Sequence, residues 1–344
     1  MRAVQIPQHG GPEVLQLVDL PDPEAGPGEV LVRVTAASIN HLDLWVRRGM
    51  PGMHIPLPRI PGSDGTGVIA ALGDGVGDLS VGDRVVILPG HSSGTSAHDR
   101  SGNDHLSDDY GIRGEHSDGI DCELVALERR YVMPLPTGID PIEAAAIPLV
   151  FLTAWGLLVE RAQIESGETA LVLAGASGVG SAAIQLAVDR GARVIATAGS
   201  AAKRALCKDL GADEVLDHHD PDWPKQVHAL TNKRGCDVVV EHVGPATWKG
   251  AMRALARNGR LVTCGGTTGP TVELLLPHLF MKNLSILGST MGPARAFPAI
   301  FEGVQRGAYR PVIDRVLPLD EVAEAHRLLE AGEASGKIVL QIGE

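Results

Sequence analysis

Aromatic residues, cysteines and dense positive charge are scarce in this sequence. Phe, Trp and Tyr together make up 3% of the 344 residues, so an aliphatic core is expected. The four cysteines form no CxxC pair, which excludes a disulfide framework and a cysteine zinc finger. The formal net charge is −12 and no dense Lys/Arg run occurs, which argues against nucleic-acid and anionic-membrane partners. Reduced thiols are typical of a cytoplasmic protein.

A leader peptide and a membrane span are not expected either. The opening residues, MRAVQIPQHGGPEV, lack the apolar stretch that a signal peptide needs. The uncharged stretch 169–188 carries three glycines in its middle. It is therefore interpreted as a strand, a glycine turn and a buried helix rather than as a membrane span.

Length and patterning predict two domains, since a domain typically has about 150 residues. Near the N-terminus, segments such as GEVLVRVTAASI (28–39) alternate apolar and polar positions, as half-buried strands do. Tight Gly/Asp turns separate them, so this part is predicted to be a small antiparallel barrel or sandwich. Residues 90–119 are polar, rich in Ser, Asp, Gly and His, and are interpreted as a long solvated loop.

From about residue 140 the sequence alternates between nearly apolar segments and helical segments. Strands covered on both faces are apolar in this way, so the alternation predicts a doubly wound parallel sheet. The six expected strands are 169–174, 192–198, 213–218, 236–243, 259–266 and 284–290. Segments from 294 to the C-terminus are expected to return to the first domain.

A glycine-rich turn, Gly175-Ala176-Ser177-Gly178-Val179-Gly180, follows the first of these strands and opens a helix. Small residues let the chain reverse tightly, approach a pyrophosphate and pack the helix on the strand. The helix N-terminus then offers N–H groups and partial positive charge to phosphates. The pattern is GxSxxG rather than a strict GxGxxG, but its place between strand and helix predicts a dinucleotide site.

Together with SINHLDLWVRRG, PGSDGTGVI, IPLVFLTAWGLL, GRLVTCGGTTG and GKIVL, this turn carries a resemblance that runs nearly end to end. The chain resembles the medium-chain dehydrogenase/reductase superfamily, near its zinc-free quinone oxidoreductase-like members. The resemblance implies an α/β fold: a Rossmann doubly wound parallel sheet (136–292) plus a GroES-like β-barrel catalytic domain (1–135 and 293–344). It also implies an active site in the cleft between the two domains.

Zinc-dependent relatives hold a catalytic zinc with a Cys, a His-Glu pair and a second Cys or acid. The matching positions here are Asn40, Ser63-Asp64 and Leu149, so no metal site is expected. The structural-zinc cysteines of relatives match Ser93, Ser96, Asp99 and Ser107, which makes the 90–119 loop a former zinc lobe. Four histidines of this loop leave open a loosely bound metal: His91, His98, His105 and His116.

Asn40 and Asp43 are the expected catalytic residues. By the resemblance, the amide of Asn40 donates to a substrate carbonyl or to the nicotinamide ribose, or bonds within its turn. Asp43 either organises this segment for function or is structural. Leu42 replaces the hydroxyl with which zinc alcohol dehydrogenases relay protons, which argues against ordinary alcohol oxidation.

The expected cofactor-binding residues lie in the glycine turn, at the carboxyl ends of later strands and on the linker helix. Ligands bind at that edge of open parallel sheets. The expected cofactor-binding residues are Thr153, Gly175, Ser177, Gly178, Val179, Gly180, Ser200, Lys203, Arg204, His242, Val243, Cys264, Gly265, Ser289 and Thr290.

The expected cofactor is NADPH (NADP). NAD-specific sites carry an acid at the end of the second strand, roughly 20 residues beyond the glycine turn. Here that strand ends in Ala198-Gly199-Ser200, and no acid occurs between Gly191 and Lys203. Ser200, Lys203 and Arg204 are instead expected to hold a 2′-phosphate.

The sequence as a whole predicts an NADPH-dependent oxidoreductase that acts without zinc on a quinone or an activated alkene. A zinc-free carbonyl reductase or alcohol dehydrogenase is the first alternative. A non-catalytic NADPH-binding sensor or structural protein is the second. The expected partners are a small-molecule substrate and a second copy of the chain, as a homodimer or homotetramer paired through LSILGST (284–290).

Overall fold

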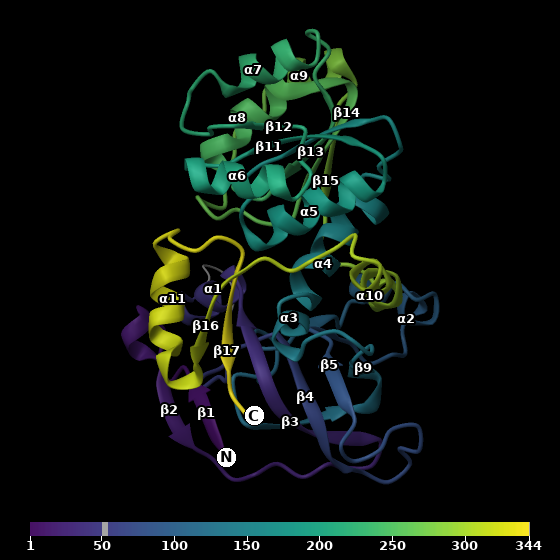
Figure 1. The fold of residues 1–344 in the computed structure, drawn as a ribbon, viewed down its shortest axis with the longest axis vertical. Coiled ribbons are helices and arrows are strands. Elements are labelled where there is room, and N and C mark those ends of the chain that lie inside the picture. Colours follow the sequence, from purple (N-terminus) through teal and green to yellow (C-terminus); the bar gives the residue numbers. More distant parts are fainter. Residues whose placement is uncertain (50–53, 344) are drawn as a thin grey trace. The chain divides into compact units, whose positions relative to one another are not determined.

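The computed structural model describes residues 1–49 and 54–343, which form two compact units (Figure 1). The first unit comprises Met1–Leu149 and Pro311–Glu344, and the second comprises Val150–Arg310. Both boundaries lie further along the chain than the expected ones at 135/136 and 292/293. Local packing of the segments on either side explains the difference.

Helix α3 (Pro141–Ala145) remains with the first unit because strand side chains bind it. Ser38 Oγ donates to the carbonyl of Ala145, and Thr66 Oγ1 donates to the carbonyl of Pro141, each at 2.9 Å. The segment after α10 (Phe297–Gln305) remains with the second unit. There Tyr309 donates to Asp189 at 2.6 Å and its ring centroid lies 5.7 Å from that of Phe151.

The first unit is built on a seven-stranded sheet with the order β16-β17-β3-β4-β5-β9, with β8 also paired to β3. All pairs are antiparallel except β16 with β17. The 11-residue β3 pairs with three strands and changes register twice along β4, and such bulges bend a strand enough to curl a sheet. The expected small barrel-like domain of mostly antiparallel strands is therefore present.

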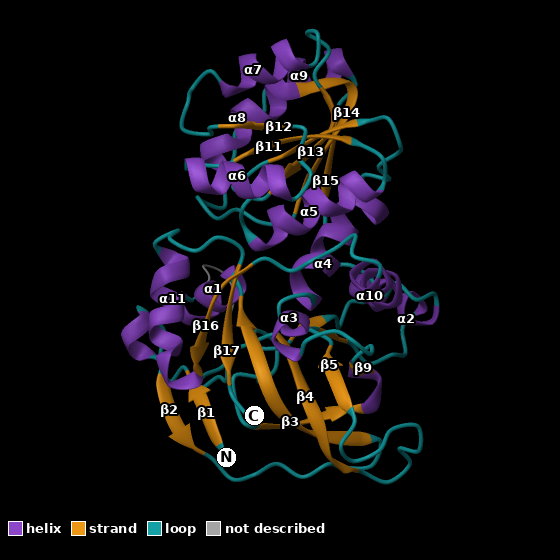
Figure 2. Cartoon of the chain, viewed as in Figure 1, coloured by secondary structure: helices purple, strands orange, loops and turns teal. Residues whose placement is uncertain are grey.

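Short helices and two two-stranded ribbons, β1 with β2 and β6 with β7, complete this unit (Figure 2). The strands are β1 (Arg2–Gln5), β2 (Gln16–Asp19), β3 (Glu29–Ile39), β4 (Asp64–Leu72), β5 (Arg84–Ile87), β6 (Gly90–His91), β7 (Gly111–Ile112), β8 (Leu124–Glu128), β9 (Val132–Pro134), β16 (Ile313–Pro318) and β17 (Lys337–Gln341). The α-helices are α1 (His41–Arg48), α2 (Ala97–Arg100), α3 and α11 (Val322–Glu330).

The core of the first unit is aliphatic, as the shortage of aromatic residues predicts. Branched side chains of β3, β5 and β17 that alternate along their strands fill it, including Val32, Val34, Ile87 and Leu340, all with no exposed surface. The C-terminal strand β17 lies between β16 and β3. Residues 337–341 thus pair with β3, a strand near the N-terminus. This pairing confirms that the C-terminal segment returns to the first domain.

The second unit is a six-stranded, all-parallel sheet with the order β12-β11-β10-β13-β14-β15. This is the doubly wound order: β10, β11 and β12 follow one another toward one edge of the sheet, and β13, β14 and β15 follow one another toward the other. The order of the strands therefore reverses between β10 and β13. The strands are β10 (Thr169–Val172), β11 (Arg193–Thr197), β12 (Glu214–Leu216), β13 (Cys236–Glu241), β14 (Leu255–Thr263) and β15 (Ser285–Gly288). The predicted Rossmann fold is therefore confirmed.

The helices between these strands are α5 (Gly178–Asp189), α6 (Ala201–Asp209), α7 (Trp223–Leu230), α8 (Pro245–Ala254) and α9 (Leu276–Lys282). Helix α4 (Pro148–Trp155), which begins at the boundary of the units, precedes the first strand, and α10 follows the last. The uncharged stretch 169–188 is β10, the glycine turn and α5, as expected. Across residues 1–49 and 54–343, no helix has both the length and the apolar character needed to cross a membrane.

Residues 90–119 are more ordered than the expected solvated loop. They contain β6, α2 and β7, and one carboxylate organises their middle. Asp99 accepts hydrogen bonds from the hydroxyls of Ser92 at 2.6 Å and Ser107 at 3.1 Å, and from the backbone N–H of Ser96 at 2.9 Å. Ser107 also donates to Ser96 Oγ at 2.7 Å. A carboxylate thus joins positions 96, 99 and 107, where the relatives carry cysteines.

We predict that Asp99→Ala opens this segment while leaving the sheets folded. The hydroxyl and N–H donors lower the pKa of Asp99, so its ordering effect is present at neutral pH and is lost as pH falls through that low pKa. Limited proteolysis should cleave the variant within 92–109 at least about tenfold faster than the parent, because local opening exposes backbone. Equal cleavage of Asp99→Ala and the control Asp108→Ala would contradict this role.

Candidate functional site

Two groups of chemistry-bearing residues emerge, and each lies within one unit. The first follows the carboxyl ends of the parallel strands in the second unit. The second is a buried polar network in the first unit, where β3, β4 and β17 meet. Most residues expected from the sequence fall into one of these groups, and several residues not expected join them.

The glycine turn connects β10 to α5 at the point where the sheet order reverses. Ser177 is the N-cap of α5, and its Oγ accepts a hydrogen bond from Gly180 N at 3.1 Å. A Cβ on Gly175 would lie 2.9 Å from both Cys207 Sγ and Ile184 Cδ1, so only glycine fits. The first N–H groups of α5, those of Gly178 and Val179, are thus placed at the sheet edge that binds pyrophosphate in this fold.

The next strand, β11, ends at Thr197, and Ser200, three residues on, is the N-cap of α6. Ser200 Oγ accepts from Lys203 N at 3.2 Å, which places Lys203 on the first turn of that helix. Arg204 instead forms an ion pair with Asp217, at 2.8 Å between Nη1 and Oδ2. Of the three expected phosphate ligands, Arg204 is therefore already bound to a carboxylate.

The carboxyl end of β13 carries His242 and Val243, as expected. His242 Nε2 lies 3.0 Å from the carbonyl of Leu173, and burial lowers the pKa of this imidazole to about 4. The neutral ring therefore donates its Nε2 proton to that carbonyl. Glu241, which the sequence analysis did not single out, shapes the turn: it accepts from Val243 N at 3.0 Å and from the Thr247 hydroxyl at 2.6 Å.

Cys264 and Gly265 follow β14, and Ser289 and Thr290 follow β15, so both pairs lie at the same sheet edge. Burial raises the pKa of the Cys264 thiol to about 12, which leaves it a poor nucleophile. Ser289 N donates to the Thr263 carbonyl at 2.9 Å and continues the β14–β15 pairing. Thr153, on α4, donates to Met291 Sδ at 3.5 Å.

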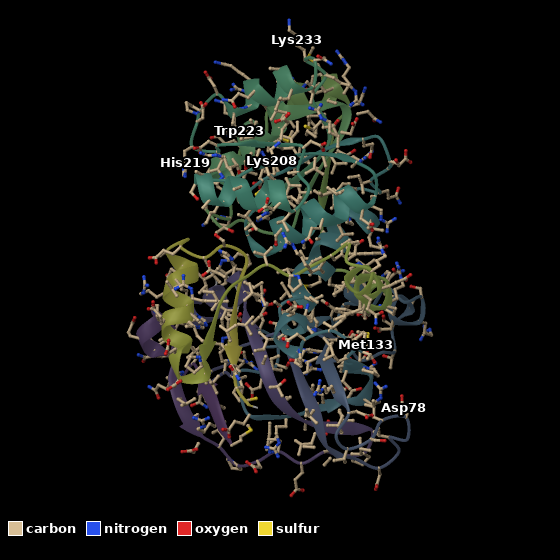
Figure 3. All side chains as sticks on the ribbon, viewed as in Figure 1. Asp78, Met133, Lys208, His219, Trp223 and Lys233 are labelled. Carbon is tan, nitrogen blue, oxygen red and sulfur yellow. The ribbon has the colours of Figure 1, made fainter. Side chains whose placement is uncertain are left out.

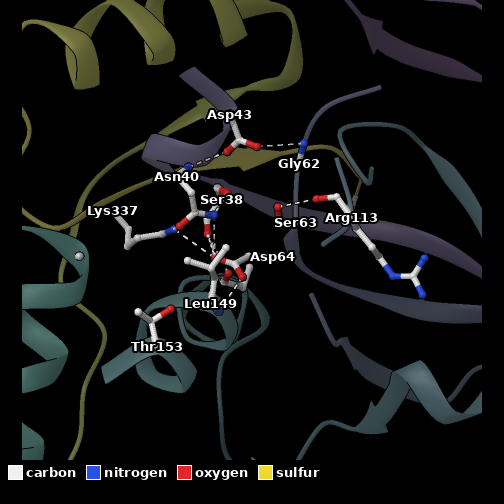
Figure 4. A network of polar contacts seen from close by, with 12 residues as sticks. Ser38, Asn40, Asp43, Gly62, Ser63, Asp64, Arg113, Leu149, Thr153 and Lys337 are labelled. Atoms are coloured by element: carbon white, nitrogen blue, oxygen red, sulfur yellow. Dashed lines mark hydrogen bonds and ion pairs between the residues drawn. The ribbon is translucent and has the colours of Figure 1, made fainter. Parts of the chain in front are cut away.

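In the first unit, the buried network centres on the carboxylate of Asp64 at the start of β4 (Figure 4). Asp64 has no exposed surface, and Oδ1 accepts from Leu149 N at 2.7 Å. Oδ2 accepts from Asn40 Nδ2 at 3.0 Å and from Ser38 Oγ at 3.2 Å. Asn40 and Leu149 therefore both contact Asp64, and all three residues stand at positions compared above with zinc ligands.

The cation of this network is Lys337, the first residue of β17. Its Nζ lies 3.1 Å from Asp64 Oδ2 and donates to Asn40 Oδ1, and its side chain is 3% exposed. An ammonium group has three protons. Two are used here, and no described residue accepts the third. Lys337 was not among the expected site residues, because in the sequence it is only a lysine at the start of an apolar strand, 273 residues from Asp64.

Asn40 and Asp43 lie in this network and support its geometry. Both protons of Asn40 Nδ2 are engaged, since the group also donates to the Ser38 carbonyl at 3.3 Å. Asp43 accepts from Asn40 N at 2.7 Å and from Gly62 N at 3.2 Å, and so joins α1 to the segment before β4. Burial raises the pKa of Asp43 to about 6, against the opposing effects of the Asn40 N–H and Lys337.

Ser63 takes no part in the network, because its hydroxyl donates to the carbonyl of Arg113 at 2.7 Å. Within the described ranges, no three side chains of the His, Cys, Asp or Glu type are grouped as metal ligands. Neither the loop histidines nor the Asp64 cluster makes such a group. The Asp64 carboxylate is instead satisfied by hydrogen bonds and by the ammonium of Lys337.

Comparisons with known proteins cover nearly the whole chain. Residues 26–137 match the alcohol dehydrogenase GroES-like domain, and residues 178–306 match the zinc-binding dehydrogenase family. A quinone oxidoreductase of Pseudomonas aeruginosa is 32% identical over 351 residues, covering 98% of this chain and 99% of the relative. A quinone oxidoreductase of Homo sapiens is 29% identical over 99% of this chain and 97% of the relative.

Solved structures agree with this assignment. A crystal structure described as an NAD-dependent alcohol dehydrogenase has a TM-score of 0.96 and 48% identity, and each chain covers 100% of the other. A crotonyl-CoA carboxylase/reductase in complex with NADP has a TM-score of 0.88 and 27% identity, over 99% of this chain and 94% of that one. The protein therefore belongs to the medium-chain dehydrogenase/reductase superfamily, with a GroES-like domain and a Rossmann domain, and is an oxidoreductase.

Proposed function

We propose that the protein uses NADPH to reduce a quinone or the β-carbon of an activated alkene, such as an enone or an enoyl compound, without zinc. The observation that carries this proposal is the buried contact of Lys337 with Asp64 and Asn40. Quinone oxidoreductases are among the relatives that span nearly the whole chain, and they support the same class of acceptor.

The residues at the former metal position do not fit a zinc ion. Zinc in proteins is held tetrahedrally by thiolate, imidazole and carboxylate ligands. Of the four matching residues only Asp64 has a carboxylate, and it already accepts hydrogen bonds from Ser38, Asn40, Leu149 N and Lys337. The ammonium of Lys337, which is bound to Asp64, would also repel a dication. Lys337 therefore supplies the positive charge that a metal supplies elsewhere.

This charge has a chemical use in alkene or quinone reduction. When bound, the cofactor supplies a hydride to the acceptor, and negative charge develops on the acceptor's oxygen. A preorganised donor aimed at such an oxyanion stabilises the transition state by roughly 2.7–4 kcal/mol. We assign this donation to the third proton of Lys337, with Asn40 and Asp64 holding the ammonium in place. Asn40 and Asp43 then act as positioning residues.

The dinucleotide fits the second unit. The N–H groups of Gly178 and Val179 would hold the pyrophosphate, and the ends of β13, β14 and β15 would line the nicotinamide half. No acid follows β11 at Ala198-Gly199-Ser200, so nothing there repels a 2′-phosphate. Ser200 and Lys203 would hold that phosphate, which favours NADPH over NADH.

A zinc-free alcohol dehydrogenase is the second candidate. The 48% identical neighbour, described as an NAD-dependent alcohol dehydrogenase, favours it and would also favour NAD. Leu42, in place of the proton-relay hydroxyl, speaks against it. A non-catalytic NADPH-binding sensor or structural protein is the third candidate, and no contact in the described residues favours it over catalysis.

We further propose a cytoplasmic homodimer. All four cysteines are free thiols, which suits a reducing compartment. β15 is an edge strand, and Leu275, Leu276, Phe280 and Met281 on or beside the preceding α9 are 61–70% exposed. Pairing of two β15 edges about a two-fold axis would cover backbone and apolar surface together. Light scattering at micromolar concentration should give twice the chain mass, and a monomer mass would contradict the pairing.

The reaction is tested by following NADPH oxidation with 1,4-quinones, enones, enoyl thioesters and simple aldehydes. We expect turnover of quinones or enones with NADPH at a kcat/KM at least about tenfold above that with aldehydes. Preference for aldehydes or alcohols would favour the alcohol dehydrogenase candidate. Tight NADPH binding without any turnover would favour the sensor.

Lys337→Met tests the proposed donor. The variant keeps the length of the side chain but removes the charge, so kcat should fall by about 100-fold, the typical effect of losing one oxyanion donor. The NADPH dissociation constant should change little. Because Asp64 is left unpaired, the variant should also lose about 3–5 kcal/mol of stability, which denaturant unfolding measures. Lys337→Arg keeps the charge, so compared with Lys337→Met it should recover more of the stability than of kcat. An unaltered kcat in Lys337→Met would contradict the assignment.

A further inference from the structure

The end of β11 is bordered by the segment that follows β12. The two strands are parallel neighbours, with Thr197 paired to Leu216, and Ala198 N donates to the Leu216 carbonyl at 3.0 Å. Residues that follow β12 therefore lie beside residues that follow β11. Those residues are Asp217, His218 and His219, and none was singled out in the sequence.

Two imidazoles lie against Gly199, immediately before the N-cap of α6. A Cβ on Gly199 would be 2.6 Å from His219 Nε2 and 2.7 Å from His218 Nε2, so a larger residue there would displace both rings. The two rings are 4.6 Å apart and meet edge to face. NAD-specific sites place a carboxylate at this end of the strand. This chain fills that space with two ring nitrogens instead.

Charged groups of both signs surround the pair. α6 contributes Lys203 and Arg204, and the segment after β12 contributes Asp217, Asp220 and Asp222. Asp220 accepts from Gln226 Nε2 at 2.7 Å, and Asp222 pairs with Lys225 at 2.6 Å. Asp217 is already neutralised, since it accepts from Arg204 Nη1 at 2.8 Å and from His219 N at 2.9 Å. Within the described residues, no hydrogen bond reaches a ring nitrogen of His218 or His219. His218 is half-buried and His219 is exposed at the surface of the second unit (Figure 3).

We propose that His218 and His219, with Lys203 and Ser200, form a proton-dependent subsite for the cofactor's 2′-phosphate, so that preference for NADPH over NADH strengthens as pH falls. This proposal rests on the proposed use of NADPH. It names the residues that contact the 2′-phosphate. It also makes cofactor choice depend on pH, which neither the fold nor the glycine turn requires.

The direction of the pH effect follows from linkage. Without ligand, burial, His219 and the cations Lys203 and Arg204 lower the pKa of His218, while Asp217 opposes them. A bound phosphate is dianionic near neutral pH and would raise the pKa of His218. Phosphate binding then takes up protons, so affinity rises as pH falls, by at most about tenfold per pH unit for each proton taken up. NADH lacks the 2′-phosphate and should show no such rise.

Binding of cofactor fragments to the full-length chain tests this without any catalytic readout. The probes are 2′,5′-ADP, the adenosine half of NADPH, and 5′-AMP, the matching half of NADH. Isothermal titration calorimetry at pH 6.5 and pH 8.5 should show 2′,5′-ADP binding at least about tenfold tighter at the lower pH, with 5′-AMP nearly unchanged. The double variant His218→Asn/His219→Asn should lose most of this dependence. His98→Asn, at an exposed residue of the first unit, is the matched control.

The outcomes separate this proposal from the proposed function. If 2′,5′-ADP binds tighter than 5′-AMP but its pH dependence is the same in parent and double variant, the histidine subsite is wrong while NADPH preference stands. If the parent binds 2′,5′-ADP no better than 5′-AMP at either pH, both are wrong. Retained 5′-AMP affinity shows that the double variant is folded. Should it not fold, the single variant at the exposed His219 replaces it and should lose part of the pH dependence.

Discussion

A carboxylate without exposed surface governs the first unit. Asp64 is stable in its ionised form only if its charge is balanced and its oxygens are hydrogen-bonded. The chain meets this requirement by bringing Lys337 from the C-terminal strand to Asp64 at the start of β4. The order of the sheet permits this contact, because β17 lies beside β3 and brings the ammonium to Asp64 and Asn40. The proposed chemistry depends on this one contact as well.

The second unit is organised by a different constraint, the parallel direction of its strands. Because all six run the same way, every loop that follows a strand lies at one edge. The glycine turn, the N-cap Ser200, the Glu241-shaped turn and the ends of β14 and β15 therefore gather at that edge, where side-chain contacts such as that of His242 with the Leu173 carbonyl add to the strand pairing. Residues from 175 to 290 are thereby brought to one edge, as the proposed dinucleotide site requires, and His218 and His219 lie at the next strand along.

Sequence patterns predicted this second group far better than the first. Strand ends and glycine turns are local signals, so the expected residues at β10, β11, β13, β14 and β15 lie at the expected edge. The Lys337–Asp64 contact joins positions far apart in sequence, and β17 shows only an apolar pattern with a lysine at its start. Asp99 is a similar case. The absence of the four cysteines can be read from the sequence, whereas the contacts by which Asp99 joins three of those positions depend on how the segment folds. The domain boundaries also depend on tertiary contacts, those of α3 and Tyr309.

Metal analysis of the active protein tests the central claim most directly. The account predicts that protein produced in zinc-supplemented medium contains far less than one metal ion per chain by mass spectrometry. It also predicts that dialysis against a strong chelator leaves quinone or enone reduction by NADPH unchanged. One tightly bound zinc per chain, whose removal abolishes activity and whose return restores it, would contradict the account.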